Sequence, residues 1–381
     1  MGAYQHLDRP AAPAQPSRPK YYTPPSGSPL QALPDDVLRR LLAGVPILDH
    51  GATAAACRAF RAVVNGPQFL ALRRRYGFAE HDIVLVGCRD PPIKVRTART
   101  SRVQFDITGG YTISAEGSPH SVSTTDGGSR LFVFTRQGDA LHRQDVWVVD
   151  VSSGECRFLA NLPMRRRSHC MEWHGGCLYV AGGRGYPANG EYARYLRSFQ
   201  IFNEATGAWD DSPPMPHGCA DAASGVIGNQ LVIAGGYATP SNPGLVGYNL
   251  VTQLYDFTTR TWRVGAPLPF RRTDACGVVC DAKLFVTSGH DSAGMLVYDP
   301  QADIWSAESY TEQVAPISGE LGVRAACTHN GRLVVFLKNG TARERAAAGD
   351  WSAYDLADEA RDIVADTPGY IDYMAQTVLL G

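Results

Sequence analysis

One short pattern is written three times in the middle of this 381-residue chain. A run of Leu, Val, Ile, Phe or Tyr ends in two small residues, a second apolar run ends in Asp or Asn, and a Trp follows six residues later. The copies begin at Leu178, Leu231 and Leu284 and end at Trp209, Trp262 and Trp305. The first small residue of each closing pair lies at 182, 235 and 288, a spacing of 53 residues each time. A repeat of this size specifies one supersecondary unit that stacks on copies of itself, so it constrains the architecture more than any other feature.

Each part of the pattern has a physical reason. Apolar runs bounded by Gly and Asp are typical of β-strands. A double glycine lets the backbone adopt positive φ or approach a neighbouring strand closely. The acid can bond its own backbone and begin a turn, and the Trp supplies apolar surface for packing one sheet on the next. The pattern therefore predicts small β-sheets that cannot bury their faces alone and that need neighbours in a ring.

The composition is that of a globular protein, with 44% apolar and 19% charged residues. A net charge of -1 gives no electrostatic reason to expect nucleic acid or membrane binding. No apolar run approaches the roughly 18 residues of a membrane helix, and no hydrophobic signal core is present. Nine cysteines without an export signal predict reduced thiols and a cytoplasmic or nuclear location, or both.

Residues 1–29 contain seven prolines and few large aliphatic residues. This composition predicts a disordered, proline-rich tail. A ligand for a proline-binding module is the less favoured alternative.

Residues 30–76 have a helical pattern. Pro34, Asp35 and Asp36 suit a helix N-terminus, and Pro46 ends that helix. We expect a second helix over residues 52–64 and a third from Phe69. Three short helices make a marginal core, so this segment is expected to depend on a partner.

Three parts of this segment resemble an F-box, the helical module that docks on the Skp adaptor of a cullin-RING ubiquitin ligase. They are Leu33–Val37, Val45–Pro46 and Cys57–Arg61, although Phe60 stands where the family usually has Trp. An ordinary helical cap on the next domain is the alternative. The resemblance implies that the adaptor is bound by Leu33, Pro34, Val37, Leu38, Leu41, Leu42, Pro46 and Phe60.

Weaker copies of the strand pattern extend it over residues 80–381. We expect Ile83–Cys88 to be the second strand of a first blade, with Val103–Asp106 as its third strand and Tyr111 in the Trp position. Leu131–Thr135, Val146–Asp150 and Leu333–Leu337 belong to further copies. The repeats resemble the kelch repeat, which implies a mainly β fold, a six-bladed kelch β-propeller. The first blade lacks a first strand, and we predict that a strand within Ile371–Leu380 supplies it.

A metal site is not expected. His169, Cys170, His174 and Cys177 resemble zinc ligands, but Cys170 and Cys276 each lie 12 residues before a strand end of the repeat. Both therefore fill one repeat position, where a small buried residue suits an inner strand. No nucleophile elbow and no Walker phosphate loop is present, so neither a cofactor nor a catalytic residue is expected.

Arginines between the blades are the better candidates for binding a target. Kelch proteins have arginines at such positions, pointing at the mouth of the central channel, and the planar guanidinium can grip carboxylates. The alternative is that they satisfy neighbouring carboxylates or strand-end carbonyls. The candidates are Arg166, Arg167, Arg184, Arg271 and Arg272.

An F-box followed by a kelch propeller resembles the plant F-box/kelch-repeat proteins. The resemblance implies a non-catalytic substrate-recognition subunit of an SCF ubiquitin ligase, which binds the Skp adaptor and a protein target for degradation. A phenylpropanoid enzyme such as phenylalanine ammonia-lyase is one such target. Two alternatives stay open: a ligase-independent kelch scaffold, and a kelch-type metal-dependent enzyme or specifier. Specifiers share a Glu-x-x-x-Asp-x-x-x-His run, which no Glu of this chain begins.

Overall fold

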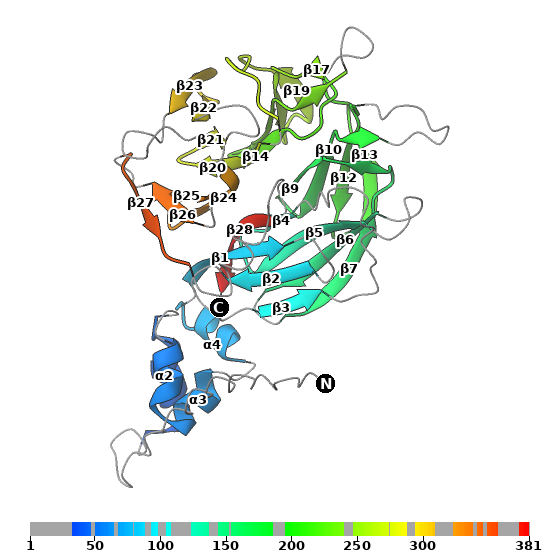
Figure 1. Cartoon of the computed structure of the whole chain (residues 1–381). Coiled ribbons are helices and arrows are strands. Elements are labelled where there is room, and N and C mark those ends of the chain that lie inside the picture. The colour runs from blue at the N-terminus through cyan, green and yellow to red at the C-terminus, as the bar shows by residue number, and fades with distance from the viewer. Residues whose placement is uncertain are drawn as a thin grey trace, which may run out of the picture. The chain divides into compact units, whose positions relative to one another are not determined.

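The computed structural model divides the chain into two compact units, Met1–Phe78 and Ala79–Gly381 (Figure 1). No helix in the part of the chain that it describes has both the length and the apolar character needed to cross a bilayer. The described residues are 33–46, 50–64, 68–78, 80–87, 93–97, 104–107, 123–136, 144–151, 154–185, 195–239, 247–273, 275–287, 294–308, 323–337, 341–345, 349–356 and 373–380.

The first unit consists of short helices around a small apolar core. Its helices are α1 (Asp35–Ala43), α2 (His50–Ala56), α3 (Arg58–Val64) and α4 (Phe69–Arg75). The guanidinium of Arg73 in α4 is fully buried, and its Nη1 donates to the carbonyl oxygens of Ala43, at 2.7 Å, and Val45. A cation from α4 thereby satisfies carbonyls that the C-terminus of α1 leaves unpaired. The core residues are Leu42, Ala43, Ala54, Val64 and Phe69.

The prediction of one helix over residues 52–64 is wrong, because the structure has two helices there. Cys57 lies between α2 and α3 and is buried. Its Sγ accepts a hydrogen bond from the backbone N–H of Phe60 at 3.4 Å. The thiol thus takes the place of an N-cap side chain at the start of α3, a role that the alanine-rich sequence does not reveal.

The second unit is mainly β. Among the described residues its strands form six four-stranded sheets and two small ribbons of two strands. The strands are β1 (Glu80–Gly87), β2 (Ile93–Thr97), β3 (Gln104–Ile107), β4 (Ser123–Thr125), β5 (Arg130–Arg136), β6 (Gln144–Asp150), β7 (Cys156–Asn161), β8 (Arg166–Arg167), β9 (Cys170–His174), β10 (Cys177–Ala181), β11 (Arg184–Gly185), β12 (Phe199–Asn203), β13 (Ala208–Asp211), β14 (Ala223–Ile227), β15 (Gln230–Ala234), β16 (Tyr237–Ala238), β17 (Gly247–Tyr248), β18 (Thr252–Asp256), β19 (Thr261–Val264), β20 (Gly277–Cys280), β21 (Lys283–Val286), β22 (Met295–Asp299), β23 (Ile304–Glu308), β24 (Val323–His329), β25 (Arg332–Leu337), β26 (Ala342–Arg345), β27 (Trp351–Tyr354) and β28 (Tyr373–Leu380).

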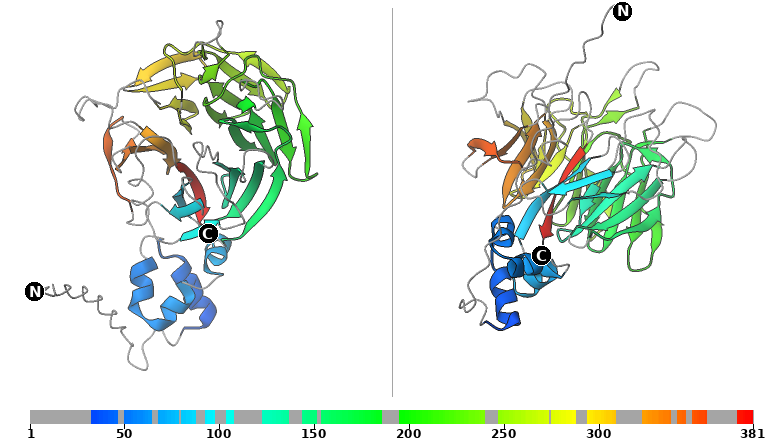
Figure 2. Two further views of the ribbon diagram at one scale, coloured as in Figure 1. Left: turned by 45° about the vertical axis from the view of Figure 1, so that its right-hand side comes forward. Right: turned by 60° about the horizontal axis from the view of Figure 1, so that its bottom comes forward.

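These sheets are arranged as a β-propeller, as predicted (Figure 2, left). Contacts between strands at one end of each sheet run in the order β4, β9, β14, β20, β24, β28 and back to β4. Five sheets are each built from strands that are neighbours in sequence, with the ribbons β8–β11 and β16–β17 beside them. Because the contacts return to their starting strand, this row of sheet ends is closed.

The remaining sheet joins the two ends of the second unit in the order β28-β1-β2-β3. β28 pairs antiparallel with β1 over eight residues, from Glu80 opposite Leu380 to Gly87 opposite Tyr373. The predicted C-terminal strand is therefore confirmed. The prediction for Val103–Asp106 is wrong in its position: β3 is the fourth strand, and β2, which has Lys94 and Arg96 in alternation and no closing acid, is the third. Tyr111 lies outside the described residues.

The apolar core of the propeller lies between the sheets. Each of four tryptophans packs against the apolar cluster that its own sheet shares with the preceding one, as predicted from the repeat. Trp262 and Trp305 also form hydrogen bonds to the preceding sheet. Their Nε1 groups donate to Pro213 O and Ala266 O, each at 3.0 Å. The four are Trp209, Trp262, Trp305 and Trp351.

The glycine pairs are required by both conformation and space. Gly182 and Gly183 have φ of 65° and 96°, and Gly235 and Gly236 have 76° and 85°. A Cβ on Gly236 would lie 2.4 Å from the carbonyl oxygen of Ala220, and one on Gly182 would lie 2.5 Å from that of Cys219. Only glycine fits these positions without displacing the carbonyl group that faces it.

The acids of the repeat begin tight turns. The Oδ1 of Asp256 accepts the N–H groups of Thr258 and Thr259 at 2.9 and 2.8 Å, and Asn203 and Asp299 make the same pair of bonds one repeat away on either side. The bond from Thr259 is the main reason that the pKa of Asp256 lies below its usual value. This turn fixes the step of six residues to the Trp.

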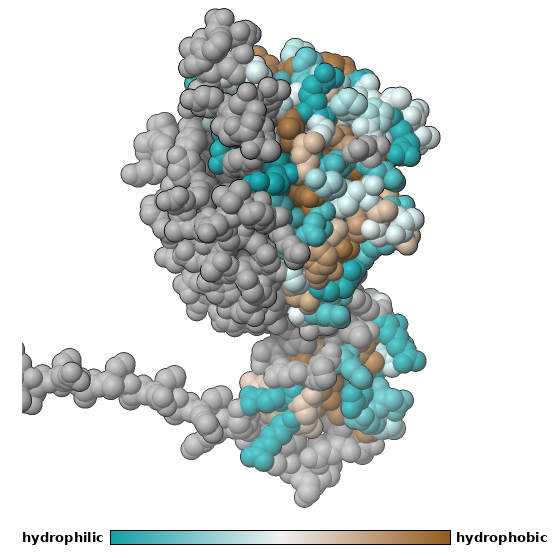
Figure 3. Space-filling model, turned by 90° about the vertical axis from the view of Figure 1, so that its right-hand side faces the viewer, coloured by the Kyte–Doolittle hydropathy of each residue, from teal (hydrophilic) through white to brown (hydrophobic). Residues whose placement is uncertain are grey.

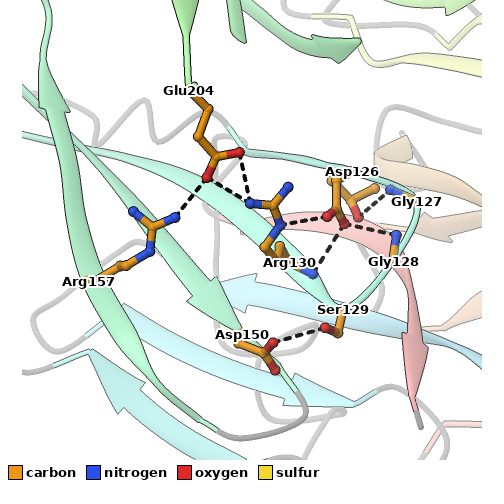
Figure 4. A network of polar contacts seen from close by, with 9 residues as sticks. Asp126, Gly127, Gly128, Ser129, Arg130, Asp150, Arg157 and Glu204 are labelled. Atoms are coloured by element: carbon orange, nitrogen blue, oxygen red, sulfur yellow. Dashed lines mark hydrogen bonds and ion pairs between the residues drawn. The ribbon is translucent and has the colours of Figure 1, made fainter. Parts of the chain in front are cut away.

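A charged cluster joins two neighbouring sheets (Figure 4). The carboxylate of Glu204 accepts from Nη1 of Arg130 at 2.7 and 2.9 Å and from Nη2 of Arg157 at 2.8 Å. Arg130 is also held by Asp126 at 2.7 Å. Burial alone lowers the pKa of Arg130, but its bonds to Asp126 and Glu204 outweigh that effect and raise it. The cluster therefore ties β5 and β7 to the turn after β12.

Candidate binding surfaces

The outer face of α1 exposes apolar side chains. Val37 is 38% exposed and Leu41 is 56% exposed, and they lie one helical turn apart. Leu33 is half-buried, and Pro34 and Pro46 at the two ends of this segment are exposed. We call Leu33, Val37 and Leu41 the apolar α1 face. Two large aliphatic side chains in water, on a unit with so small a core, are typical of a protein-binding surface.

The other predicted adaptor-binding residues belong to the core. Leu42 is 5% exposed, and Leu38 and Phe60 are partly buried against the same cluster. These three side chains can shape the apolar α1 face from beneath but present little surface of their own. The helical period alone does not show which of the predicted residues are exposed and which are buried. That distinction requires the position of α4, which covers the inner side of α1.

Two of the predicted target-binding arginines are structural. Arg166 is fully buried; its Nη1 donates to Gly182 O at 3.0 Å and its Nη2 to Gln200 Oε1 at 2.6 Å. Its own backbone N–H donates to Gln144 Oε1 at 2.7 Å. Arg272 is 5% exposed, and its carbonyl accepts from Gly236 N at 2.7 Å. Neither presents a surface to a target in this conformation.

The other three arginines lie nearer the surface. Arg167 and Arg184 are half-buried and face each other in the ribbon β8–β11, and Arg271 is exposed. The Cζ of Arg184 lies over the rings of Tyr195 and Tyr237, 5.4 and 5.0 Å from their centroids. Its Nη2 is 3.2 Å from Asp221 Oδ2. Arg184 is thus held in a fixed position by the two tyrosine rings and Asp221.

A second stack continues the first. The ring of Tyr237 lies 5.9 Å from that of Tyr248, and the Cζ of Arg271 lies 4.8 Å from the Tyr248 centroid. Five side chains therefore follow one another from one sheet to the next, with arginine and tyrosine interleaved. We call them the stacked row: Tyr195, Arg184, Tyr237, Tyr248 and Arg271.

The tyrosines of the stacked row were missed in the sequence, although a signal exists. Tyr195 and Tyr248 are 53 residues apart, as are Arg184 and Tyr237. The same two positions of the repeat thus hold a cation–π pair in one copy, Arg184 with Tyr195, and a pair of tyrosines in the next. Arg166, Cys219 and Arg272 also follow one another at intervals of 53 residues, so they occupy one position of the repeat. A cysteine at that position already indicates that the position is buried.

The suspected metal ligands are packing groups. His169 is buried, with its ring 4.7 Å from that of Phe134 in an edge-on contact. Burial raises the pKa of the Cys170 thiol well above its usual value, which opposes the thiolate form that a metal needs. Within the described ranges no group of three or more His, Cys, Asp or Glu could hold a metal ion.

The chain is similar in sequence to known proteins. Residues 165–216, which contain β8 to β13, match the family model of the kelch motif. An F-box/kelch-repeat protein of Arabidopsis thaliana is 26% identical over 265 residues, which are 64% of this chain and 59% of that protein. Another Arabidopsis F-box/kelch-repeat protein is 23% identical over 322 residues, 81% of this chain and 76% of its own length.

A third relative is Kelch-like protein 35 of Mus musculus, 25% identical over 169 residues, which are 44% of this chain and 27% of that protein. The chain thus covers less than two thirds of the first Arabidopsis protein and of the mouse protein. It is similar to kelch-repeat proteins, including ones of the F-box type.

Proposed function

We propose that this protein is the substrate-recognition subunit of an SCF-type ubiquitin ligase in the cytoplasm or nucleus. The helical unit acts as an F-box and binds a Skp adaptor, and the propeller binds the protein that is to be ubiquitinated. The sheet β28-β1-β2-β3 serves as the sixth blade. The subunit itself is non-catalytic, since ubiquitin transfer belongs to the cullin-RING partner.

The apolar α1 face carries this proposal. Val37 and Leu41 are exposed at 38% and 56%, while the neighbouring Leu42 fills the core at 5%. Burying two such side chains against an adaptor contributes on the order of 3 kcal/mol. The similarity to F-box/kelch-repeat proteins supports the same role.

Co-expression of the full chain with a Skp adaptor tests the proposal. We expect a stable complex on gel filtration, and we expect Val37→Asp with Leu41→Asp to abolish it. Asp36→Ala is the matched control, since Asp36 is exposed on the same helix and bears no apolar surface. A chain that folds but never binds the adaptor would instead support the ligase-independent scaffold.

A target assay completes the test. Phenylalanine ammonia-lyase is the first candidate, by the resemblance to plant F-box/kelch-repeat proteins. We expect the full chain to capture it, and Arg271→Glu to reduce capture while leaving the adaptor complex intact. Equal capture by both chains would remove this enzyme, or this surface, from the proposal.

A further inference from the structure

The asparagines of the propeller differ in how firmly their side chains are held. On the face in Figure 3, polar residues lie among the apolar ones, and four of the described asparagines fix their carboxamide groups with hydrogen bonds. Asn330 is different, because it is exposed and its carboxamide has no hydrogen-bond partner among the described residues. A glycine, Gly331, follows it. The four fixed asparagines are Asn161, Asn203, Asn229 and Asn249.

Asn330 and Gly331 form the two-residue turn between β24 and β25. The last paired residues of this hairpin are His329 and Arg332. The two turn residues have φ of 51° and 72°, which is typical of Asn-Gly in tight hairpins. Both are exposed, and a Cβ on Gly331 would meet nothing within 4 Å. The turn therefore lies in solvent beyond the end of the ladder, where local opening costs little free energy.

An asparagine before a glycine can lose ammonia without a catalyst. The Gly331 nitrogen attacks Cγ of Asn330, so that an N–Cγ bond forms and the Cγ–Nδ2 bond breaks; ammonia leaves with the proton of the Gly331 N–H. Water then opens the cyclic succinimide. Cleavage of the N–Cγ bond gives aspartate, and cleavage of the bond to the main-chain carbonyl carbon gives isoaspartate. Glycine has no side chain that hinders the attack.

Gly331 also takes part in a contact between two sheets. Its carbonyl oxygen accepts a hydrogen bond from Sγ of Cys280, on β20, at 3.6 Å. Cys280 is 7% exposed and shares an apolar cluster with Leu333 of β25. Isoaspartate inserts Cβ into the main chain of the turn and adds a carboxylate beside it. Because a two-residue turn admits few backbone conformations, the longer chain displaces the Gly331 carbonyl.

We propose that Asn330 is a site of spontaneous deamidation in the folded protein, and that its isoaspartyl product loosens the contact between the sheets of β20 and β24. This modification needs no partner protein, so it is independent of the proposed function. Asn229 is the internal comparison. It is exposed in the turn between β14 and β15, but its Nδ2 donates to Asp256 and Thr258, and Gln230 follows it.

Peptide mapping of the full chain tests the site. The folded chain is incubated at mildly alkaline pH, digested with trypsin and analysed by electron-transfer fragmentation, which distinguishes isoaspartate from aspartate. Cleavage after Arg324, Arg332 and Lys338 separates Asn330 from Asn339, which also precedes a glycine. We expect isoaspartate to accumulate at position 330 and not at Asn229.

The melting temperature tests the effect on the fold. Tryptophan fluorescence follows unfolding of the fresh and the incubated chain, and we expect incubation to lower the midpoint by at least about 2 °C. Asn330→Gly is the matched control, because glycine keeps the positive φ of the turn and removes the carboxamide. Its midpoint should change less on incubation, since only the other asparagines remain to react.

Three results would overturn the inference. Asn330 might stay intact in the folded chain while it reacts in urea, which would mean that the turn protects it. Isoaspartate at position 330 with an unchanged midpoint would show that the contact of Gly331 with Cys280 does not depend on the turn. Equal falls in the midpoint for the native chain and Asn330→Gly would assign the effect to other asparagines.

Discussion

The guanidinium of Arg166 is fully buried and donates to Gln200 Oε1 at 2.6 Å, joining the connection before β9 to the start of β12. A further partner, Gly182 O, belongs to the glycine pair of the same sheet. An arginine in this setting holds a blade together. Arg271, which is also preceded by a Pro-containing connection, is exposed.

Replacing Arg166 should therefore destabilise the propeller. Arg166→Met leaves Gln200 and Gly182 O without their charged donor, and we expect a loss of about 3 kcal/mol in the free energy of unfolding. Urea unfolding followed by tryptophan fluorescence measures it. Arg271→Met is the control, with an expected change within about 0.5 kcal/mol. Equal losses for the two variants would contradict the structural role of Arg166.

The glycine pair predicts a difference between two substitutions that look alike. Gly236→Ala puts a Cβ 2.4 Å from Ala220 O at a φ of 85°, whereas Gly228, with φ of 56°, has nothing within 4 Å. We expect Gly228→Ala to cost about 1 kcal/mol and Gly236→Ala at least about 3 kcal/mol. The same urea titration compares them, and a smaller cost at Gly236 would show that its contact with the Ala220 backbone is not tight.

These glycines also show how much of the fold can be predicted from the sequence. The repeat specified strand ends, turns and the Trp contacts because each depends on nearby residues. β2 was missed because Lys94 and Arg96 hide its pattern, and the break at Cys57 because a thiol is not a usual cap. Arg166 and Arg271 both follow a Pro-containing connection, but the repeat aligns Arg166 with Arg272, and both of these aligned arginines are buried.

The charged cluster of Figure 4 should contribute modestly and in a salt-dependent way. Glu204→Gln removes the carboxylate that Arg130 and Arg157 share, and since these groups are partly exposed we expect a loss of about 1 kcal/mol at low salt. The loss should shrink in 1 M salt (about a 3 Å screening length). Glu344→Gln, whose partner Arg332 lies 3.4 Å away, should cost less than about 0.5 kcal/mol. If the loss of stability at Glu204 did not change with salt, it would come from lost packing and not from lost charge.

Cys219 predicts a pH dependence. Burial raises the pKa of its thiol from 9.0 to about 12 in the folded protein. Below about pH 9 the thiol is protonated in both states, so its full contribution to stability is present. As the pH rises from about 9 toward 12, the unfolded state releases the proton first and the folded state loses up to about 1.4 kcal/mol per pH unit.

The comparison is between the native chain and Cys219→Ala. The urea midpoint of the native chain should fall more steeply between about pH 8.5 and 10.5 than that of the variant, in proportion to one titrating thiol. Parallel pH profiles would show that Cys219 ionises as readily in the folded state as in the unfolded one.

The central claim is that the helical unit binds the adaptor and the propeller binds the target. The affinity of a purified Skp adaptor for the full chain and two variants tests this claim most directly. We predict that Leu41→Asp weakens adaptor binding at least about tenfold, because a 56% exposed leucine becomes a charge at the contact, while Arg271→Glu changes it less than about twofold. Calorimetric titration gives both values. Adaptor binding that survives Leu41→Asp but fails with Arg271→Glu would contradict the account, because the propeller would then hold the ligase.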